Sequence, residues 1–293
     1  MMRYRVRHET LYEYASTVNL GHNQVFLCPR DLAGQRCLSN AIRIDPEPEV
    51  RHQRVDYFGN TMVVFVVEDP HERMAIIAES DVEVEALNRE REPDLPWEEV
   101  RGRLRVDRER AGLSALEFTF DSPLVQIHQD ATAYAAKSFK PGRRVIESVR
   151  ELTSRIHQDF RYDPTTTTVT TAVDEVFEQR SGVCQDFAHL QIAMLRGLGL
   201  PARYVSGYLR TFREDEPDDP GLVGADASHA WVSVYAGDGR WIDLDPTNDQ
   251  LVGEHHVTLA WGRDYGDVAP VKGVIVGGGE QTIDVAVSVQ PVR

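Results

Sequence analysis

The stretch Arg180-Ser181-Gly182-Val183-Cys184-Gln185-Asp186-Phe187-Ala188-His189 marks the start of an amphipathic helix in this 293-residue chain. Apolar residues then recur at intervals of four, three, four and four, so that one stripe faces a core: Val183, Phe187, Leu190, Met194 and Leu198. We expect Ser181 to cap this helix and Gly199 to end it. The pattern predicts a helix over residues 181–198 with Cys184 in its first turn.

Cys184 is the candidate nucleophile. Unpaired backbone N–H groups and the positive end of the helix dipole stabilise a negative charge at a helix start, and the thiolate is the reactive form of cysteine. Cys28 and Cys37 lie in a β-rich region and are interpreted as small core residues. Three cysteines at irregular spacing argue against a disulfide framework and a paired-cysteine zinc site, so free thiols are expected.

A thiol nucleophile needs a base, and the base needs an orienting acceptor. His229 opens a predicted strand over residues 230–235, and Asp245 closes the next strand after the turn Gly237-Asp238-Gly239. Antiparallel neighbours bring such strand ends to one edge of a sheet. We therefore expect His229 and Asp245 to adjoin as base and orienting carboxylate.

Two nearby residues are weaker candidates for these roles. His189 lies five residues after Cys184, and five helical steps rotate it about 140° away, so we expect it to pack or hydrogen-bond on the helix flank. Asp243 points to the same strand face as Asp245 and remains the alternative orienting carboxylate.

Length and composition limit the classes of protein to be considered. The chain has the length of about two domains at roughly 150 residues each, and 41% hydrophobic with 27% charged residues is typical of a globular protein. A net charge of −15 disfavours nucleic acid and anionic membranes as partners. No apolar run approaches the roughly 20 residues of a membrane span, and the charged N-terminus lacks a signal-peptide core. The expected location is the cytoplasm.

The order of elements predicts an α+β fold. Residues 1–90 show alternating apolar patterns and are expected to form a β-sandwich-like N-terminal domain. Residues 91–143 are expected to be a helical linker region, and residues 144–293 a catalytic core with a helix packed on an antiparallel sheet. The run Gly277-Gly278-Gly279 lacks the context of a phosphate-binding loop and is interpreted as a turn.

Three motifs resemble those of the transglutaminase-like superfamily. Residues 180–189 with 198–208 resemble its cysteine motif, Ser228-His229-Ala230-Trp231-Val232 its histidine motif, and residues 241–248 its Asp-Pro-Thr motif. Residues 260–265 and the early β-rich region resemble the bacterial branch, which has its own N-terminal β domain. The resemblance covers nearly the whole chain.

The resemblance implies a papain-like core and a Cys-His-Asp triad. Carried over by motif, Cys184 is the nucleophile, His229 the general base and acid, and Asp245 the orienting residue. The implied chemistry is acyl transfer, in which a thiolate attacks an amide carbonyl and a thioester follows. No cofactor is implied.

Three further residues are predicted to support the triad. Beside the Cys184 backbone N–H, the Tyr162 hydroxyl is the candidate second oxyanion donor, with simple packing as the alternative. Asp186 could tune the site, although an acid in the first helical turn also stabilises the helix itself. Trp231 could wall off solvent beside His229 or fill core.

No metal site is predicted. One acidic run invites a calcium interpretation, but it lacks the spaced glycine and closing glutamate of a calcium loop and is interpreted as a solvated loop: Glu214, Asp215, Glu216, Asp218 and Asp219. His255 and His256 are adjacent, and adjacent strand residues point to opposite faces. They are therefore not expected to share a metal ion.

The predicted function is cleavage of a peptide, protein or isopeptide amide by a cysteine hydrolase. Transamidation of a protein glutamine with an amine acceptor is the first alternative, and a catalytically idle peptide-binding scaffold is the second. The presence of all three triad residues disfavours the scaffold. The sequence does not assign a substrate or an oligomeric state.

Overall fold

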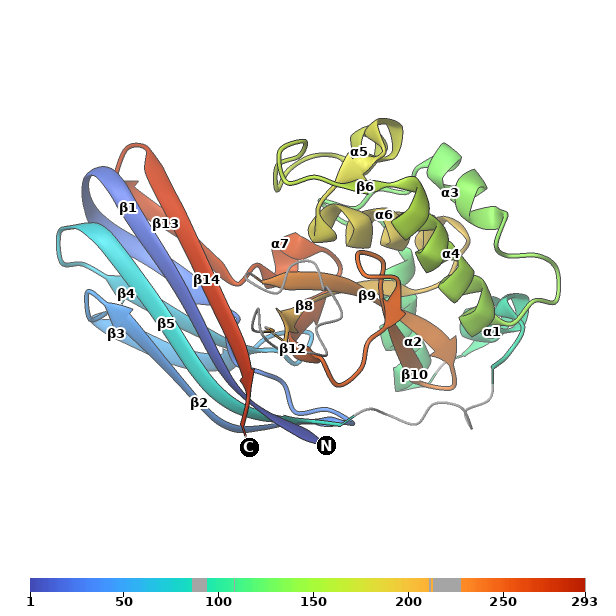
Figure 1. The fold of residues 1–293 in the computed structure, drawn as a ribbon, viewed down its shortest axis with the longest axis horizontal. Coiled ribbons are helices and arrows are strands. Elements are labelled where there is room, and N and C mark those ends of the chain that lie inside the picture. The colour runs from blue at the N-terminus through green and yellow to red at the C-terminus, as the bar shows by residue number, and fades with distance from the viewer. Residues whose placement is uncertain (86–93, 108, 211, 213–227, 293) are drawn as a thin grey trace.

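The protein contains two antiparallel sheets, and helices cover the second of them (Figure 1). A computed structural model describes residues 1–85, 94–107, 109–210, 212 and 228–292. The α+β class expected from the sequence is confirmed by this arrangement. Within the described part of the chain, no helix is long and apolar enough to cross a membrane.

The first sheet is curled around one long strand, β1, which pairs with four other strands. A register irregularity separates the residues of β1 that pair along most of β5 from those that pair with β4. Its strands are β1 (Met2–Val25), β2 (Gln35–Asp45), β3 (Val50–Val55), β4 (Thr61–Val67), β5 (His71–Val84), β13 (Val271–Gly277) and β14 (Gln281–Pro291). Along the second half of β5 every other residue is buried, which is the period-two pattern of a half-buried strand.

The last two strands belong to this first sheet. β13 and β14 both pair antiparallel with β1, and in Figure 1 they run beside it in red. The sequence-based boundary that placed residues 144–293 together in the catalytic core is therefore corrected. Alternating apolar residues fit any half-buried antiparallel sheet, so the pattern did not identify the partner strand.

The predicted turn at residues 277–279 joins β13 to β14. All three glycines have positive φ, at 98°, 84° and 65°, in a region of backbone space that glycine enters without steric cost. A Cβ on Gly277 would lie 2.4 Å from the carbonyl oxygen of Thr17. Glycine therefore lets this turn approach β1 closely.

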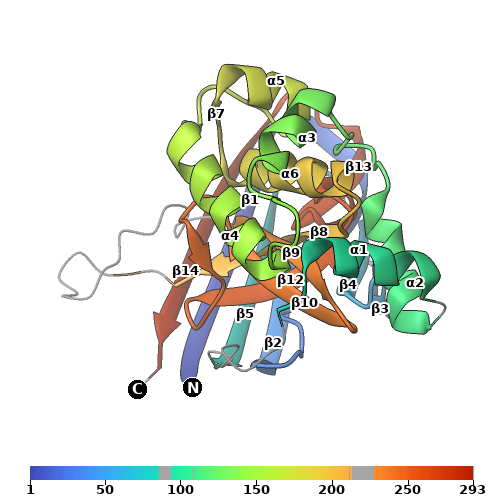
Figure 2. The same ribbon diagram turned by 90° about the vertical axis from the view of Figure 1, so that its right-hand side faces the viewer.

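The second sheet has the strand order β11-β10-β9-β8-β12, and its described pairs are antiparallel. The central helix α6 packs on β8 and β9 (Figure 2). The elements are α6 (Cys184–Gly197), β8 (Ala202–Leu209), β9 (His229–Gly237), β10 (Arg240–Asp245), β11 (Gln250–Leu251) and β12 (His256–Gly262).

Further helices surround α6 and close this core. Val100, Leu104 and Tyr134, from the segment expected to be a linker, are buried in the same apolar cluster as α6. The described part of residues 91–143 is thus helical but belongs to the core, which corrects the idea of a spacer. These elements are α1 (Trp97–Val106), α2 (Arg110–Leu116), the 3₁₀ turn η1 (Glu117–Thr119), α3 (Gln129–Ala136), α4 (Val145–Asp159), β6 (Arg161–Tyr162), α5 (Val173–Gln179), β7 (Ser181–Gly182) and α7 (Tyr265–Val268).

The start of α6 differs from the expected cap. Val183, not Ser181, is the capping residue, and Ser181 lies in the short strand β7. The Asp186 carboxylate accepts a hydrogen bond of 2.8 Å from the Val183 N–H, so it satisfies a donor at the helix start. The predicted position of Cys184 in the first helical turn is confirmed.

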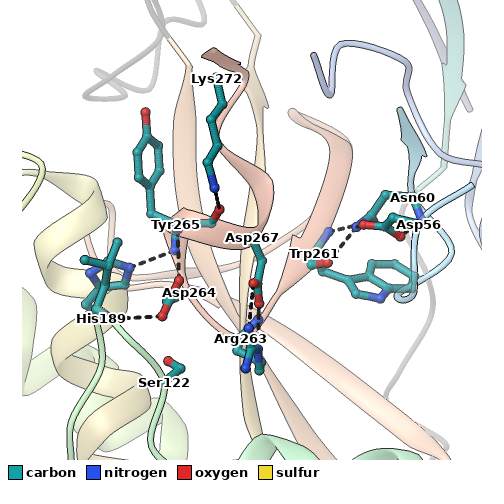
Figure 3. Close-up of polar contacts among 12 residues, drawn as sticks. Asp56, Asn60, Ser122, His189, Trp261, Arg263, Asp264, Tyr265, Asp267 and Lys272 are labelled. Carbon is teal, nitrogen blue, oxygen red and sulfur yellow. Dashed lines mark hydrogen bonds and ion pairs between the residues drawn. The ribbon is translucent and has the colours of Figure 1, made fainter. Parts of the chain in front are cut away.

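Two side-chain amides join the first sheet to the edge of the second. Gln35 donates to the Thr258 carbonyl at 2.8 Å and accepts from the Thr258 N–H at 2.7 Å. Asn60 makes the same double contact with Trp261 of β12, with both distances 2.9 Å (Figure 3). These amides imitate the hydrogen bonds of a neighbouring strand, so they cover an otherwise open edge.

We expect Asn60→Ala to lower the free energy of unfolding by about 1–3 kcal/mol, because it removes two hydrogen bonds from the partly buried N–H and C=O of Trp261. The measurement is urea unfolding, read from the midpoint at unchanged slope. Gln53→Ala, on the exposed strand β3, is the matched control and should stay within about 0.5 kcal/mol. An Asn60→Ala loss as small as the control's would contradict the edge-covering role.

Candidate active site

Cys184 is the first residue of α6 and is partly buried. Gly182, just before it, allows the chain to bend closely around Asp186: a Cβ there would lie 2.7 Å from an Asp186 carboxylate oxygen. The Thr167 hydroxyl donates to the same carboxylate at 2.6 Å. Asp186 thus caps the helix that carries the thiol, in agreement with the structural interpretation of this residue.

His229 and Asp245 adjoin, as their strand positions predicted. The His229 Nε2 and Asp245 Oδ2 atoms are 2.8 Å apart, and both side chains are fully buried. His229 begins β9 and Asp245 ends β10, which is the antiparallel neighbour of β9. The His229 ring contacts Asp245, whereas the charge of Asp243 acts on the buried Arg203 guanidinium.

The Asp245 carboxylate also accepts hydrogen bonds that the sequence did not predict. Its Oδ1 receives the backbone N–H groups of Thr247 at 2.9 Å and Asn248 at 3.2 Å. Its Oδ2 receives the Asn248 side-chain amide at 2.8 Å and lies 3.4 Å from the His256 Nε2. The Thr-Asn pair after the Asp-Pro motif was the available signal for Asn248.

His256 was considered only as one of a possible metal pair, and its position beside Asp245 was missed. It comes from β12, across the sheet from β10, so no local pattern links it to Asp245. The Gly253 N–H donates to the His256 Nδ1 at 3.5 Å. That contact leaves the Nε2 to carry the proton and donate to the Asp245 carboxylate.

Electrostatics favour a charged imidazole at His229. Burial by itself lowers the pKa of His229, but the Asp245 carboxylate and the Cys184 sulfur outweigh burial and raise that pKa. Burial likewise raises the pKa of Asp245, whereas the imidazoles of His229 and His256 bring it well below the usual range. His229 Nδ1 is buried without a hydrogen-bond partner among the described groups. Its free nitrogen and its coupling to the sulfur fit an imidazolium that faces the thiol.

Three tyrosine phenols interact electrostatically with the Cys184 thiol. Burial is the main cause that raises the pKa values of Tyr162, Tyr204 and Tyr265, and a negative charge on Cys184 adds to each shift. Tyr162 is positioned by the parallel pairing of β6 with β7, which sets it opposite Gly182. The predicted oxyanion donor Tyr162 therefore lies within electrostatic reach of Cys184.

Trp231 packs against the rings of His229 and His256. Its side chain is fully buried, and its ring centroid lies 6.2 Å from that of His229 and 5.2 Å from that of His256. The ring therefore packs against both imidazoles in the interior, as the core-filling interpretation of Trp231 expects.

His189 connects α6 to α7. Its Nε2 accepts the Tyr265 N–H at 3.1 Å, as Figure 3 shows. Burial lowers the pKa of His189 to about 4, so the ring is neutral and able to accept this bond. The Asp264 carboxylate accepts from Gly266 N–H at 2.9 Å and from Leu124 N–H at 2.9 Å. His189 thus hydrogen-bonds on the helix flank, as expected, and holds the backbone of Tyr265 in place.

The remaining observations concern metal-binding groups and the three cysteines. Within the described residues, no group of three His, Cys, Asp or Glu side chains could hold a metal ion, and the acidic run at residues 214–219 lies outside those residues. All three cysteines are free thiols. Cys28 and Cys37 are partly exposed, which corrects their interpretation as core residues, and their thiols donate to the carbonyls of Pro29 and Ser39.

Comparison with known proteins agrees with this geometry. The model of the bacterial transglutaminase-like N-terminal region matches residues 4–83, and the transglutaminase-like superfamily model matches residues 132–246. An uncharacterized protein of Mycobacterium tuberculosis is 42% identical over 99% of this chain and 93% of its own length. A second, from Mycobacterium leprae, is 34% identical over 99% of both.

A solved structure from Cytophaga hutchinsonii, named a "putative cysteine protease", shares the fold. It covers 100% of this chain and 91% of its own, with a TM-score of 0.75 and 23% identity. The two family models, the relatives and this shared fold lead to one assignment. The chain belongs to the transglutaminase-like superfamily, with the bacterial transglutaminase-like N-terminal region in front of its core.

Proposed function

We propose that the protein is a cysteine-dependent acyl-transfer enzyme that hydrolyses peptide or protein amide bonds. The observation that carries the proposal is the buried His229–Asp245 pair at 2.8 Å, whose imidazole couples to Cys184 at the start of α6. A thiol at a helix start, a base and an orienting carboxylate are the three parts that nucleophilic thiol catalysis requires.

In the acylation step, the Cys184 thiolate attacks the amide carbonyl carbon and a C–S bond forms. The carbonyl oxygen takes up the negative charge, for which the Cys184 N–H and the Tyr162 hydroxyl are the proposed donors. The His229 imidazolium then protonates the amide nitrogen, the C–N bond breaks and the amine leaves. A thioester on Cys184 and a neutral His229 remain.

In the deacylation step, neutral His229 takes a proton from water, and the oxygen attacks the thioester carbonyl. The C–S bond breaks, the carboxylic acid product leaves, and thiolate and imidazolium are restored. Asp245 holds the imidazole through its Nε2–H, so that Nδ1 faces the sulfur and carries the transferred proton. An amine in place of water would give transamidation.

Cys184 is expected to react with iodoacetamide at neutral pH at least about tenfold faster than Cys28 or Cys37, because a neighbouring imidazolium and a helix start favour a cysteine nucleophile. Cys28 is a demanding control, since the neighbouring Cys37 side chain lowers its pKa. The rates are measured on the native protein by mass spectrometry of each cysteine peptide. Equal rates at all three thiols, without turnover, would support the idle-scaffold alternative.

Cys184→Ala should abolish amide hydrolysis while the folded state persists, because the side chain is only partly buried at the helix start. Turnover is measured on a peptide library, with circular dichroism as the fold control and Cys28→Ala as the matched variant. Hydrolysis at the wild-type rate by folded Cys184→Ala protein would rule out the thiol mechanism. Adding a labelled primary amine to the same assay distinguishes transamidation, which incorporates the label.

Asp245→Asn is expected to lower kcat by on the order of 10²- to 10³-fold, less than the roughly 10⁴-fold loss known for the equivalent serine-protease change. A thiolate–imidazolium pair can form before substrate binds, so it relies less on the carboxylate. Asp243→Asn is the matched control and should remain near the wild-type rate. The opposite ranking would assign the orienting role to Asp243.

The pH profile of the same variant tests the charge on His229. The Asp245 carboxylate raises the pKa of His229, so the protonated imidazole that donates to the leaving amine should persist above its ordinary value of about 6.5. In Asp245→Asn the burial effect prevails and lowers the pKa. We therefore expect the alkaline limb of kcat/KM to move to lower pH. An unmoved limb would show that His229 does not control it.

A further inference from the structure

A pocket of about 410 Å³ lies between the first sheet and the catalytic core. One wall comes from β1, β5, β13 and β14, and the other from α7 and the loops near it. Its lining includes the apolar and aromatic side chains Tyr12, Tyr14, Met74, Leu124, Tyr265 and Ile283. We call this the interdomain pocket. Its volume suits one large side chain, together with part of the backbone of an extended peptide.

Two walls of the interdomain pocket are attached to the residues around the thiol. His189, on the catalytic helix, fixes the backbone of Tyr265 at 3.1 Å. Gln185, which directly follows Cys184, donates from its amide to the Val169 carbonyl at 3.0 Å, and Val169 also lines the pocket. Cys184 itself does not line the pocket, but its neighbour Gln185 is hydrogen-bonded to the lining residue Val169.

The pKa values of two tyrosines in the pocket are affected by neighbouring charged groups. Burial first, and then a charge on Cys184, raise the pKa of Tyr265. Burial together with Tyr14 and Tyr265 raises the pKa of Tyr12 to about 12. Tyr12 and Tyr265 both line the pocket, so the pocket extends from the segment that His189 fixes to the first sheet.

The charge of the interdomain pocket is opposite to that of the chain. The whole protein carries a net charge of −15, but the charged residue among the described lining residues is a lysine, Lys272. Its ammonium donates to the Gly266 carbonyl at 3.1 Å, next to Tyr265 (Figure 3). An ammonium has three donors, so this exposed group can also meet a carboxylate of a bound peptide.

We propose that the interdomain pocket is a substrate subsite, which takes a large apolar or aromatic side chain next to the scissile amide. Lys272 at its rim favours an acidic over a basic flanking residue. The inference rests on the proposed acyl-transfer function and adds its substrate class. The first sheet would then take part in substrate selection, because Tyr12 and Tyr14 come from β1 and Ile283 comes from β14.

The test compares kcat/KM for peptide amides that differ only in Phe or Ala beside the scissile bond. Wild-type protein should prefer Phe by about 10- to 100-fold, the range that an apolar pocket commonly provides. Tyr12→Ala and Ile283→Ala should each reduce this preference to within about threefold. Ile283 is exposed, so its variant should fold even if Tyr12→Ala does not. Val285→Ala, on the same strand outside the pocket, is the matched control.

The charge preference is tested with peptides that carry Glu or Lys at the position flanking the apolar residue. Wild-type protein should prefer Glu by about two- to fivefold, the effect expected of an exposed charge pair. Lys272→Gln should abolish this ratio without changing the Phe preference. Lys137→Gln, an exposed lysine on the far helical side, should preserve both. If the preference for Glu over Lys is unchanged in Lys272→Gln, Lys272 does not contribute to the subsite.

Failure of the subsite can be separated from failure of the proposed function. Cys184 is alkylated by acetyl-Phe and acetyl-Ala chloromethyl ketones, which need a thiolate and a binding site but no amide turnover. A Phe preference here without amide hydrolysis would contradict the proposed function and support the subsite. Hydrolysis with no Phe preference, or with one that survives in Ile283→Ala, would overturn the subsite alone. Equal alkylation without hydrolysis would overturn both.

Discussion

The fully buried carboxylate of Asp245 is the constraint around which the catalytic sheet is organised. A buried charge is tolerated only when paired and fully hydrogen-bonded. Its partners come from the start of β9, the turn after β10 and the start of β12: His229, Thr247, Asn248 and His256. The carboxylate therefore ties together strand ends that are not all neighbours in the sheet. The same contacts set the orientation and the charge of the His229 ring, on which the proposed chemistry depends.

The edge of that sheet depends on the first one. β12 carries His256 and, among the residues that the structure describes, no strand pairs with its outer side. Gln35 and Asn60 supply side-chain hydrogen bonds in place of a strand, and the Arg30 guanidinium lies 3.5 Å from the centre of the Trp261 ring. The N-terminal domain thus stabilises the strand that supports Asp245, and it also contributes one wall of the interdomain pocket. The interface between the N-terminal domain and the core would therefore both stabilise the strand beside Asp245 and help to select the substrate.

The catalytic helix serves several purposes within its first two turns. Asp186 caps it, Gln185 holds the loop at Val169, and His189 holds Tyr265. The contacts of Gln185 and His189 fix segments that are distant in sequence from Cys184. This explains why α6 is buried on nearly every side although its sequence reads as amphipathic. The polar residues of its outer face do not meet water; they hydrogen-bond to neighbouring segments, as buried polar groups must.

The sequence by itself determined the elements whose signal is local. The apolar stripe and Gly199 marked α6, the strand ends marked His229 and Asp245, and three glycines marked a turn with positive φ. Tertiary structure decided what depends on contacts between distant residues. It moved β13 and β14 into the N-terminal sheet, brought His256 to Asp245 and placed Tyr12 near Tyr265. The physical reason is that periodicity reports which face of an element is buried, whereas the partner on that face is selected only when the whole chain packs.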